Sequence, residues 1–308
     1  MAQVLDGKGL AAEIRAVLAR RIESWVNAGG ERPSLTLFRV GDDPASVVYV
    51  RNKEKASLEV GLQSDVVVLP DSTSESELLR RIDEANRDRR VSGILVQLPL
   101  PKGIRAEAVA DAVDPEKDVD GLHPFNQGSL ALGRPRIVAC TPLGVLALLR
   151  RHSIPISGRR VVILGRSSIV GRPLSLLLSM KASWADATVT VAHSRSRGLD
   201  SILREAEIVI AAMGRVEALR GEQLSDGVVV VDVGMHRADD PTRPGKTRLL
   251  GDVHAPSVEP KASWLSPVPG GVGPLTVVML LANTFAAHRA ARGEATTQVW
   301  DDAEMISA

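Results

Sequence analysis

VVILGRSSIVGRP, residues 161–173, joins a short apolar strand to a glycine-containing loop and then to the start of a helix. A dinucleotide-binding loop requires this order of strand, loop and helix. Phosphates bind well at such a helix start, because free N–H groups and the positive end of the helix dipole face them. Ser167 replaces the middle glycine of G-x-G-x-x-G, so a structural turn with two glycines remains the alternative. The candidate cofactor-binding residues are Gly165, Arg166, Ser167, Ser168 and Gly171.

The end of the next predicted strand, residues 188–192, indicates which dinucleotide is bound. An NAD-binding unit usually has Asp or Glu there to hold the ribose hydroxyls. Here the chain continues His193-Ser194-Arg195-Ser196-Arg197, without an acid. Hydroxyl and basic side chains suit a 2′-phosphate, so NADP is favoured, with Ser194 and Arg195 as its binding residues. The alternative is a solvated basic loop.

Around this loop the chain predicts an α/β protein of two domains. In the first half, strands at 35–40, 66–69 and 93–98 alternate with helices, which predicts a parallel sheet with right-handed crossovers. The polar stretch 114–126 then interrupts this order. In the second half, strands at 161–164, 188–192, 207–211 and 228–233 predict a Rossmann-type doubly wound unit.

The last predicted helix, residues 277–291, follows the second unit and is expected to return to the first. We therefore expect a substrate domain of residues 1–140 plus 275–292, an NADP-binding domain of residues 141–274, and a flexible tail of residues 293–308. The helix is preceded by PVPGGVGPLT, residues 267–276, where glycines without Cβ atoms allow backbone to lie against a ligand. An ordinary turn with a helix cap is the alternative for this loop.

Composition excludes several classes of function. The net charge of +1 gives no general attraction to nucleic acid, and aromatic residues at 3% argue against base-stacking surfaces. A single cysteine excludes an internal disulfide and a cysteine-based zinc site. We expect no metal. No signal-peptide pattern and no apolar run of membrane-spanning length is present, so a cytoplasmic protein is expected.

Candidate catalytic residues lie on the predicted helix after residue 43. Ser46, Tyr49 and Lys53 are three and four residues apart, so they share one face of the helix. A lysine against apolar surface loses proton affinity and can then serve in acid–base chemistry. An exposed lysine on a solvated face is the commoner alternative.

Two polar residues lie near predicted strand ends or loops. Gln97 is near the carboxyl end of the strand at 93–98, where ligands bind in open α/β sheets; it is either a ligand-binding residue or a turn cap. Asp120 could accept hydrogen bonds from an amino-pyrimidine ring, or could form a turn. His123 and Cys140 are taken as structural.

Five segments in register make the chain similar to bifunctional methylenetetrahydrofolate dehydrogenase/methenyltetrahydrofolate cyclohydrolase. The resemblance extends from residue 4 to about residue 287. The segments are residues 44–53, 93–101, 117–121, 165–173 and 267–276.

The resemblance implies roles for individual residues. Lys53 matches the catalytic lysine, Tyr49 the tyrosine that helps to position the folate, and Gln97 the glutamine that hydrogen-bonds the lysine. Asp120 matches the carboxylate that binds the pterin ring. Arg166, Ser167 and Ser194 match residues that bind the NADP phosphates. The loop at 270–276, with Gly271 and Pro274 as candidate substrate contacts, matches the one between nicotinamide and folate.

The resemblance also implies a function in one-carbon metabolism. The expected reactions are NADP-dependent oxidation of 5,10-methylenetetrahydrofolate and hydrolysis of the methenyl product to 10-formyltetrahydrofolate, by a homodimer. Two alternatives remain from the residues: a dehydrogenase for another small substrate, and an NADP-sensing module without catalysis. The set of Tyr49, Lys53, Gln97 and Asp120 argues against the second.

Overall fold

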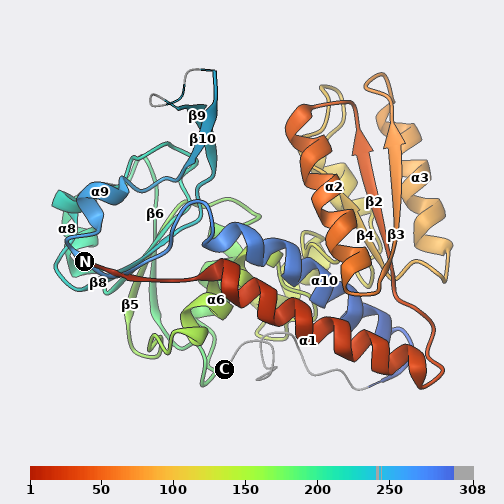
Figure 1. Ribbon diagram of the computed structural model, residues 1–308, viewed down its shortest axis with the longest axis horizontal. Coiled ribbons are helices and arrows are strands. Elements are labelled where there is room, and N and C mark those ends of the chain that lie inside the picture. The colour runs from red at the N-terminus through yellow and green to blue at the C-terminus, as the bar shows by residue number, and fades with distance from the viewer. Residues whose placement is uncertain (241–242, 244, 295–308) are drawn as a thin grey trace. The chain divides into compact units, whose positions relative to one another are not determined.

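A computed structural model describes residues 1–240, 243 and 245–294 (Figure 1). The chain divides into two compact units. The unit named here the Lys53 unit contains Glu13–Cys140 and the described residues after 276; the Gly165 unit contains Met1–Ala12 and Thr141–Thr276. The first residues group with the Gly165 unit, rather than with the domain expected from the sequence, because β1 (Gln3–Val4) pairs with β11 (Ala262–Leu265).

The Lys53 unit is built on three parallel strands in the order β3-β2-β4. These are β2 (Ser34–Val40), β3 (Gln63–Leu69) and β4 (Gly93–Val96). The predicted parallel sheet is therefore confirmed. β3 begins three residues before the predicted start, because Gln63 already pairs with Ser34. Ile94, which lies in β4, also forms a parallel bridge with Asp118. The 117–119 segment therefore lies beside β4.

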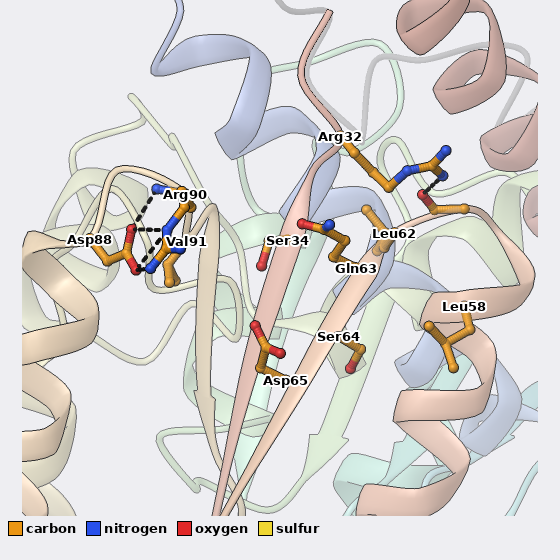
Figure 2. A pocket seen from close by; sticks show the side chains of 11 residues that line it. Arg32, Ser34, Leu58, Leu62, Gln63, Ser64, Asp65, Asp88, Arg90 and Val91 are labelled. Carbon is orange, nitrogen blue, oxygen red and sulfur yellow. Dashed lines mark hydrogen bonds and ion pairs between the residues drawn. The ribbon is translucent and has the colours of Figure 1, made fainter.

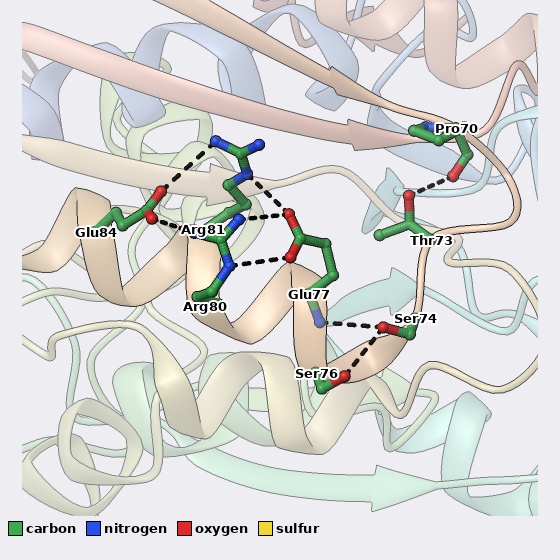
Figure 3. A network of polar contacts seen from close by, with 8 residues as sticks. All are labelled: Pro70, Thr73, Ser74, Ser76, Glu77, Arg80, Arg81 and Glu84. Atoms are coloured by element: carbon green, nitrogen blue, oxygen red, sulfur yellow. Dashed lines mark hydrogen bonds and ion pairs between the residues drawn. The ribbon is translucent and has the colours of Figure 1, made fainter.

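Two helices of this unit begin with strong capping interactions. Asp43 caps α2 (Pro44–Glu59) by accepting a hydrogen bond from the Ser46 N–H at 2.8 Å, and Pro44 occupies the first turn. Ser74 caps α3 (Glu75–Arg87) in the same way. Figure 3 shows the exposed side of α3, where glutamates and arginines form ion pairs one turn apart. The opposite side buries Leu78, Ile82 and Ala85.

The last helix, α10 (Val272–Ala290), begins five residues before its predicted start, inside the glycine-rich loop. Pro274 lies in its first turn, where a missing N–H costs little. Residues 278–282 of α10 are all buried. Within the Lys53 unit, Phe285 of α10 packs edge-on against Trp25 of α1 (Gly7–Asn27), with ring centroids 6.5 Å apart. α10 thus completes the core of the Lys53 unit.

The Gly165 unit contains a six-stranded sheet in the order β1-β11-β8-β7-β5-β6, and the paired neighbours are all parallel. Its central strands are buried on both faces, as expected when helices cover a parallel sheet. This confirms the predicted Rossmann-type unit. The remaining strands are β5 (Arg160–Leu164), β6 (Thr188–Ala192), β7 (Ile208–Ala211) and β8 (Val228–Asp232).

Several elements were not predicted. α5 (Pro124–Ala131) begins inside the polar stretch, and β9 (His236–Asp239) pairs antiparallel with β10 (Thr247–Leu250).

No helix among the described residues is long and apolar enough to span a bilayer. The predicted tail from residue 295 onward lies outside the described residues. The other helices are α4 (Ala106–Ala112), α6 (Cys140–Arg151), α7 (Gly171–Leu178), α8 (Leu199–Glu205), α9 (Ala255–Val258) and η1 (Gly221–Gln223).

Candidate active site

Lys53 and Gln97 meet at the carboxyl end of the sheet in the Lys53 unit. The Lys53 ammonium donates a hydrogen bond to Gln97 Oε1 at 3.0 Å. Gln97 Nε2 donates to the Leu98 carbonyl at 2.6 Å, which turns the amide oxygen toward the lysine. The Gln97 N–H donates to the Phe38 carbonyl of β2. The glutamine is therefore held at both ends and fixes the position of the lysine.

The environment of Lys53 favours the neutral amine. Burial lowers the pKa of Lys53, while the negative charge of Asp120 acts in the opposite direction. Gln97 offers a neutral oxygen instead of a carboxylate, so it orients the ammonium without compensating its charge fully. Such a lysine can exchange a proton nearer to neutral pH than an exposed one.

Tyr49 and Ser46 lie on the same helix as Lys53. Tyr49 is 39% exposed, so its ring is available to a ligand. Ser46 is 2% exposed, and its hydroxyl has no hydrogen-bond partner among the described residues. A buried polar atom without a partner is uncommon in a folded protein. Of the two, Tyr49 is therefore the residue of this helix face that a ligand can reach.

Asp120 is carried by a loop that Asp118 organises. The buried carboxylate of Asp118 accepts hydrogen bonds from the N–H groups of Leu122 and His123, at 3.1 and 2.8 Å, and from Asn126 Nδ2 at 2.8 Å. Burial raises the pKa of Asp118 to about 6 despite these donors. Asp120 itself is half-buried. The parallel bridge between Ile94 and Asp118 makes the segments that carry Gln97 and Asp120 run side by side.

Asn283 of α10 fixes the same loop from the other side. Its Nδ2 donates to the carbonyls of Val119 and Val138, at 2.9 and 3.0 Å. Cys140 is buried, and its thiol donates to the Val119 carbonyl at 3.4 Å. Burial raises the pKa of that thiol well above its usual value, and Asp120 adds to the effect. The thiol therefore stays protonated, consistent with the structural role expected from the sequence.

His123 also has a structural contact. Its Nδ1 accepts from the Phe125 N–H at the start of α5. Sequence reasoning missed Asp118 and Asn283. Asp118 lay in the quoted 117–121 segment, but nothing in the sequence pointed to Asn283.

The glycine loop after β5 has the tight geometry that a dinucleotide site needs. A Cβ atom on Gly165 would lie 2.1 Å from the Ala212 carbonyl, and one on Gly171 2.2 Å from the Gly165 carbonyl. Only glycine fits at both positions. Between them Arg166, Ser167 and Ser168 are exposed at the start of α7. The loop therefore fits a phosphate group that approaches the backbone and the helix N-terminus.

Ser194 and Arg195 lie in an exposed turn after β6. The turn is closed by hydrogen bonds from the His193 N–H to Ser196 Oγ at 3.0 Å and from the Arg195 N–H to His193 Nδ1 at 3.2 Å. Ser194 and Arg195 are both exposed and follow the edge strand β6, whose end pairs with the end of β5 next to the Gly165 loop.

The glycine-proline loop before α10 is held within the Gly165 unit. The Lys8 N–H donates to the Gly270 carbonyl at 2.7 Å, and the Gly271 N–H donates to the Pro267 carbonyl at 2.8 Å. Gly271 is buried and Pro274 is partly exposed. A role of these two residues in substrate binding stays a prediction.

A cavity of about 830 Å³ lies elsewhere in the Lys53 unit (Figure 2). It is at the amino ends of the strands, away from Gln97. Its arginines already have partners, because Arg90 pairs with Asp88 and Arg32 donates to the Gly61 carbonyl. Among the described residues, no group of three or more His, Cys, Asp or Glu side chains could hold a metal.

Comparison with known proteins identifies the family to which both parts of the chain are similar. Residues 5–120 match the catalytic domain, and residues 139–292 the NAD(P)-binding domain, of tetrahydrofolate dehydrogenase/cyclohydrolase. The bifunctional protein FolD of Desulfovibrio desulfuricans is 48% identical over 286 residues, covering 93% of this chain and 98% of that protein.

Two crystal structures are also similar over nearly their whole length. The Campylobacter jejuni bifunctional enzyme FolD is 41% identical with a TM-score of 0.88, covering 94% of this chain and 99% of that one. The Trypanosoma brucei dehydrogenase-cyclohydrolase, complexed with NADP and an inhibitor, is 38% identical with a TM-score of 0.88, covering 94% and 98%. From its two matched domains and these full-length relatives, the chain belongs to the FolD family of tetrahydrofolate dehydrogenase/cyclohydrolases.

Proposed function

We propose that this bifunctional enzyme of one-carbon metabolism oxidises 5,10-methylenetetrahydrofolate with NADP⁺ and hydrolyses the methenyl product to 10-formyltetrahydrofolate, with Lys53 managing the protons of the hydrolysis. The observation that carries the assignment of Lys53 is its 3.0 Å hydrogen bond to Gln97, in surroundings that lower its pKa.

The oxidation needs little chemistry from side chains. NADP⁺, when bound, accepts a hydride from the one-carbon bridge of the folate. The folate nitrogens stabilise the resulting cation, so no base is required. The protein has to bind and orient the two reactants and exclude water. We assign Asp120 to the pterin ring and Tyr49 to the folate beside it, because both are at least partly exposed and near Lys53. Tyr49 is one turn before Lys53 on α2, and the charge of Asp120 acts on the pKa of Lys53.

The hydrolysis needs a group that both accepts and donates a proton. Water adds to the methenyl carbon and loses one proton, and the bond from that carbon to N5 breaks as N5 takes up a proton. The remaining hydroxyl proton leaves to solvent as the formyl C=O forms, so one proton is released overall. Neutral Lys53 can accept the proton that the water loses, and its ammonium can then donate one to N5. The lowered pKa makes the neutral amine easier to form than in an exposed lysine, and the hydrogen bond to Gln97 keeps the nitrogen in one place.

We further propose NADP rather than NAD as the cofactor, with a homodimer as the working form. Gly165, Arg166, Ser167, Ser168 and Gly171 would hold the pyrophosphate, and Ser194 and Arg195 the 2′-phosphate. The exposed turn after β6 supports this preference, because it presents a hydroxyl and a guanidinium at the edge where the ribose of a dinucleotide binds. Reaction of the purified protein with NADP⁺ and with NAD⁺ in parallel tests the preference; comparable kcat/KM values would contradict it.

The decisive variant is Lys53→Met, because it keeps the bulk of the side chain and removes the titrating nitrogen. We expect cyclohydrolase activity to fall by at least about 10³-fold, while dehydrogenase activity at saturating NADP⁺ falls much less. Methenyl product and NADPH are followed separately. Lys55→Met, two residues along the same helix with a 77% exposed side chain, is the matched control. Equal loss of both activities with folate binding intact would refute the assignment of Lys53 to hydrolysis.

A further inference from the structure

Two buried aspartates lie at the carboxyl end of the sheet in the Gly165 unit. Asp232 is the last residue of β8 and is 4% exposed, and Asp252 follows β10 and is fully buried. Burying a carboxylate is costly unless several donors surround it. Neither residue has a part in the chemistry described above. Both carboxylates instead accept hydrogen bonds from backbone N–H groups of loops.

Asp252 holds the turn after β7. Its Oδ2 accepts hydrogen bonds from the N–H groups of Met213 and Gly214, and its Oδ1 accepts from the Arg215 N–H at 2.9 Å. Oδ1 also lies 2.7 Å from His236 Nε2. Successive backbone N–H groups that converge in this way form an anion-binding nest. Here the carboxylate of the protein itself fills the nest and fixes the turn.

Asp232 holds the loop after β8 and the backbone of Asp252. Its Oδ1 accepts from the N–H groups of Gly234 and Asp252, both at 2.9 Å, and its Oδ2 accepts from the Val253 N–H at 3.0 Å. The Asp232 N–H donates to Ser266 Oγ at 2.7 Å. The two aspartates therefore tie three separate segments into one cluster.

A glycine faces each carboxylate at a distance that excludes any side chain. A Cβ atom on Gly234 would lie 2.4 Å from Asp252 Oδ1, and one on Gly251 would lie 1.8 Å from Asp232 Oδ2. The backbone thus closes around both aspartates, and the turns after β7 and β8 cannot shift without breaking several hydrogen bonds at once.

These two turns lie on a defined side of the cofactor site. In the sheet, β5 has β6 on one side and β7 then β8 on the other. A dinucleotide with its pyrophosphate at the loop after β5 and its adenosine ribose at the end of β6 extends its nicotinamide half over β7 and β8. Ala212, which begins the turn, is already in contact range of the loop, because its carbonyl would lie 2.1 Å from a Cβ on Gly165.

We propose that Asp252 and Asp232 are positioning residues for the nicotinamide half of the cofactor site. They set the turns at 212–215 and 233–236 against which that half binds, and they touch no substrate atom themselves. The proposal rests on the dinucleotide binding in the proposed function, and wild-type binding of NADP⁺ tests that part separately.

The test is Asp252→Asn, an isosteric change that puts an amide NH₂ against N–H donors. NADP⁺ and adenosine 2′,5′-bisphosphate are titrated by calorimetry at low temperature. We expect NADP⁺ affinity to fall by about tenfold or more, because donors of the turn lose their acceptor. Affinities for adenosine 2′,5′-bisphosphate and tetrahydrofolate should stay within about twofold.

Glu207→Gln is the matched control. Glu207 also accepts a backbone N–H, from Arg160 at 3.0 Å, but at the amino ends of the strands of the same sheet. It should leave the affinity for NADP⁺ unchanged. His236→Ala removes one donor to Asp252 and leaves the nest, so we expect a smaller loss of NADP⁺ affinity in the same direction.

Several outcomes would overturn the proposal. One is an Asp252→Asn variant that binds NADP⁺ as wild type does. Equal weakening of NADP⁺ and adenosine 2′,5′-bisphosphate would overturn the assignment to the nicotinamide half. If Asp252→Asn does not fold, unchanged NADP⁺ affinity of His236→Ala decides against the proposal. If wild type itself fails to bind NADP⁺, the proposed cofactor is wrong.

Discussion

Lys53 and Asp252 are both charged groups taken out of water at the carboxyl end of a parallel sheet, but their surroundings differ. Lys53 makes one hydrogen bond among the described residues, to a neutral amide oxygen. Asp252 accepts three backbone N–H groups and also contacts a histidine. The group with few partners is the one to which we assign the proton transfer. The group with every oxygen occupied holds backbone in place. The number of partners thus separates a reacting group from a positioning group.

The largest expected effect comes from removing the Asp252 carboxylate, both oxygens of which accept hydrogen bonds. Asp252→Asn should lower the free energy of unfolding by about 3 kcal/mol, because it leaves buried donors without acceptors. Thermal unfolding of the variant and of Glu207→Gln checks this. Because Glu207 is much less buried, its variant should lose clearly less stability than Asp252→Asn. A loss below about 0.5 kcal/mol for Asp252→Asn would mean that the hydrogen bonds to the Asp252 carboxylate contribute little to stability.

The second prediction tests whether Gln97, the neutral partner of Lys53, sets the proton affinity of the lysine. Gln97→Glu places a negative charge at hydrogen-bond distance, which should raise the pKa of Lys53. The pH at which half of the lysine is neutral then moves up, so the base-requiring limb of the cyclohydrolase pH profile should shift to higher pH by about one unit. Gln63→Glu, on an exposed strand start in the same unit, is the control. An unshifted profile would show that Gln97 does not tune the proton affinity of the lysine.

The smallest effect has the opposite sign from the first. Lys53→Met should raise the free energy of unfolding at pH 7 by about 1 kcal/mol, because it removes a desolvated charge with few partners. The pKa of Lys53 is lower in the folded state than its unfolded value of 10.5. The unfolded chain therefore binds the proton more tightly, and stability is lost as the pH falls through 10.5 toward the folded pKa.

The gain from Lys53→Met should consequently be present at neutral pH and disappear above about pH 10.5. Denaturant unfolding at pH 7 and at high pH, with Lys55→Met beside it, measures this. A variant that is less stable than wild type at pH 7 would mean that Lys53 contributes to folding through packing that outweighs its desolvation.

The sequence predicted those parts of the fold that depend on local pattern. β6 has the predicted bounds, and α7 begins at the predicted Gly171, because turn residues flank the apolar runs there. β11 and the hairpin of β9 and β10 were missed. Each of these strands has four residues, and those of the hairpin are largely polar, so neither period nor composition marks them.

In the candidate site, too, a local pattern marks some residues and not others. Lys53 and Gln97 could be chosen because one follows from helical spacing and the other from a strand end. Asp118, Asn283 and Asp252 could not, because their importance comes from distant partners. Asn283 contacts Val119, 164 positions earlier in the chain. Asp252 accepts from the Met213 N–H, 39 positions before it. No local pattern of residue types marks such contacts.

The position of α10 at the end of the described chain has a consequence for synthesis. Asn283 closes the loop that carries Asp120, and buried His288 is 2.8 Å from Ser92 Oγ. A ribosome that has made residues 13–140 has therefore not yet made the helix that completes their core. The Gly165 unit, by contrast, has nearly its whole sequence in one continuous stretch. The half of the molecule that is translated first should thus be the last to acquire native protection from proteases.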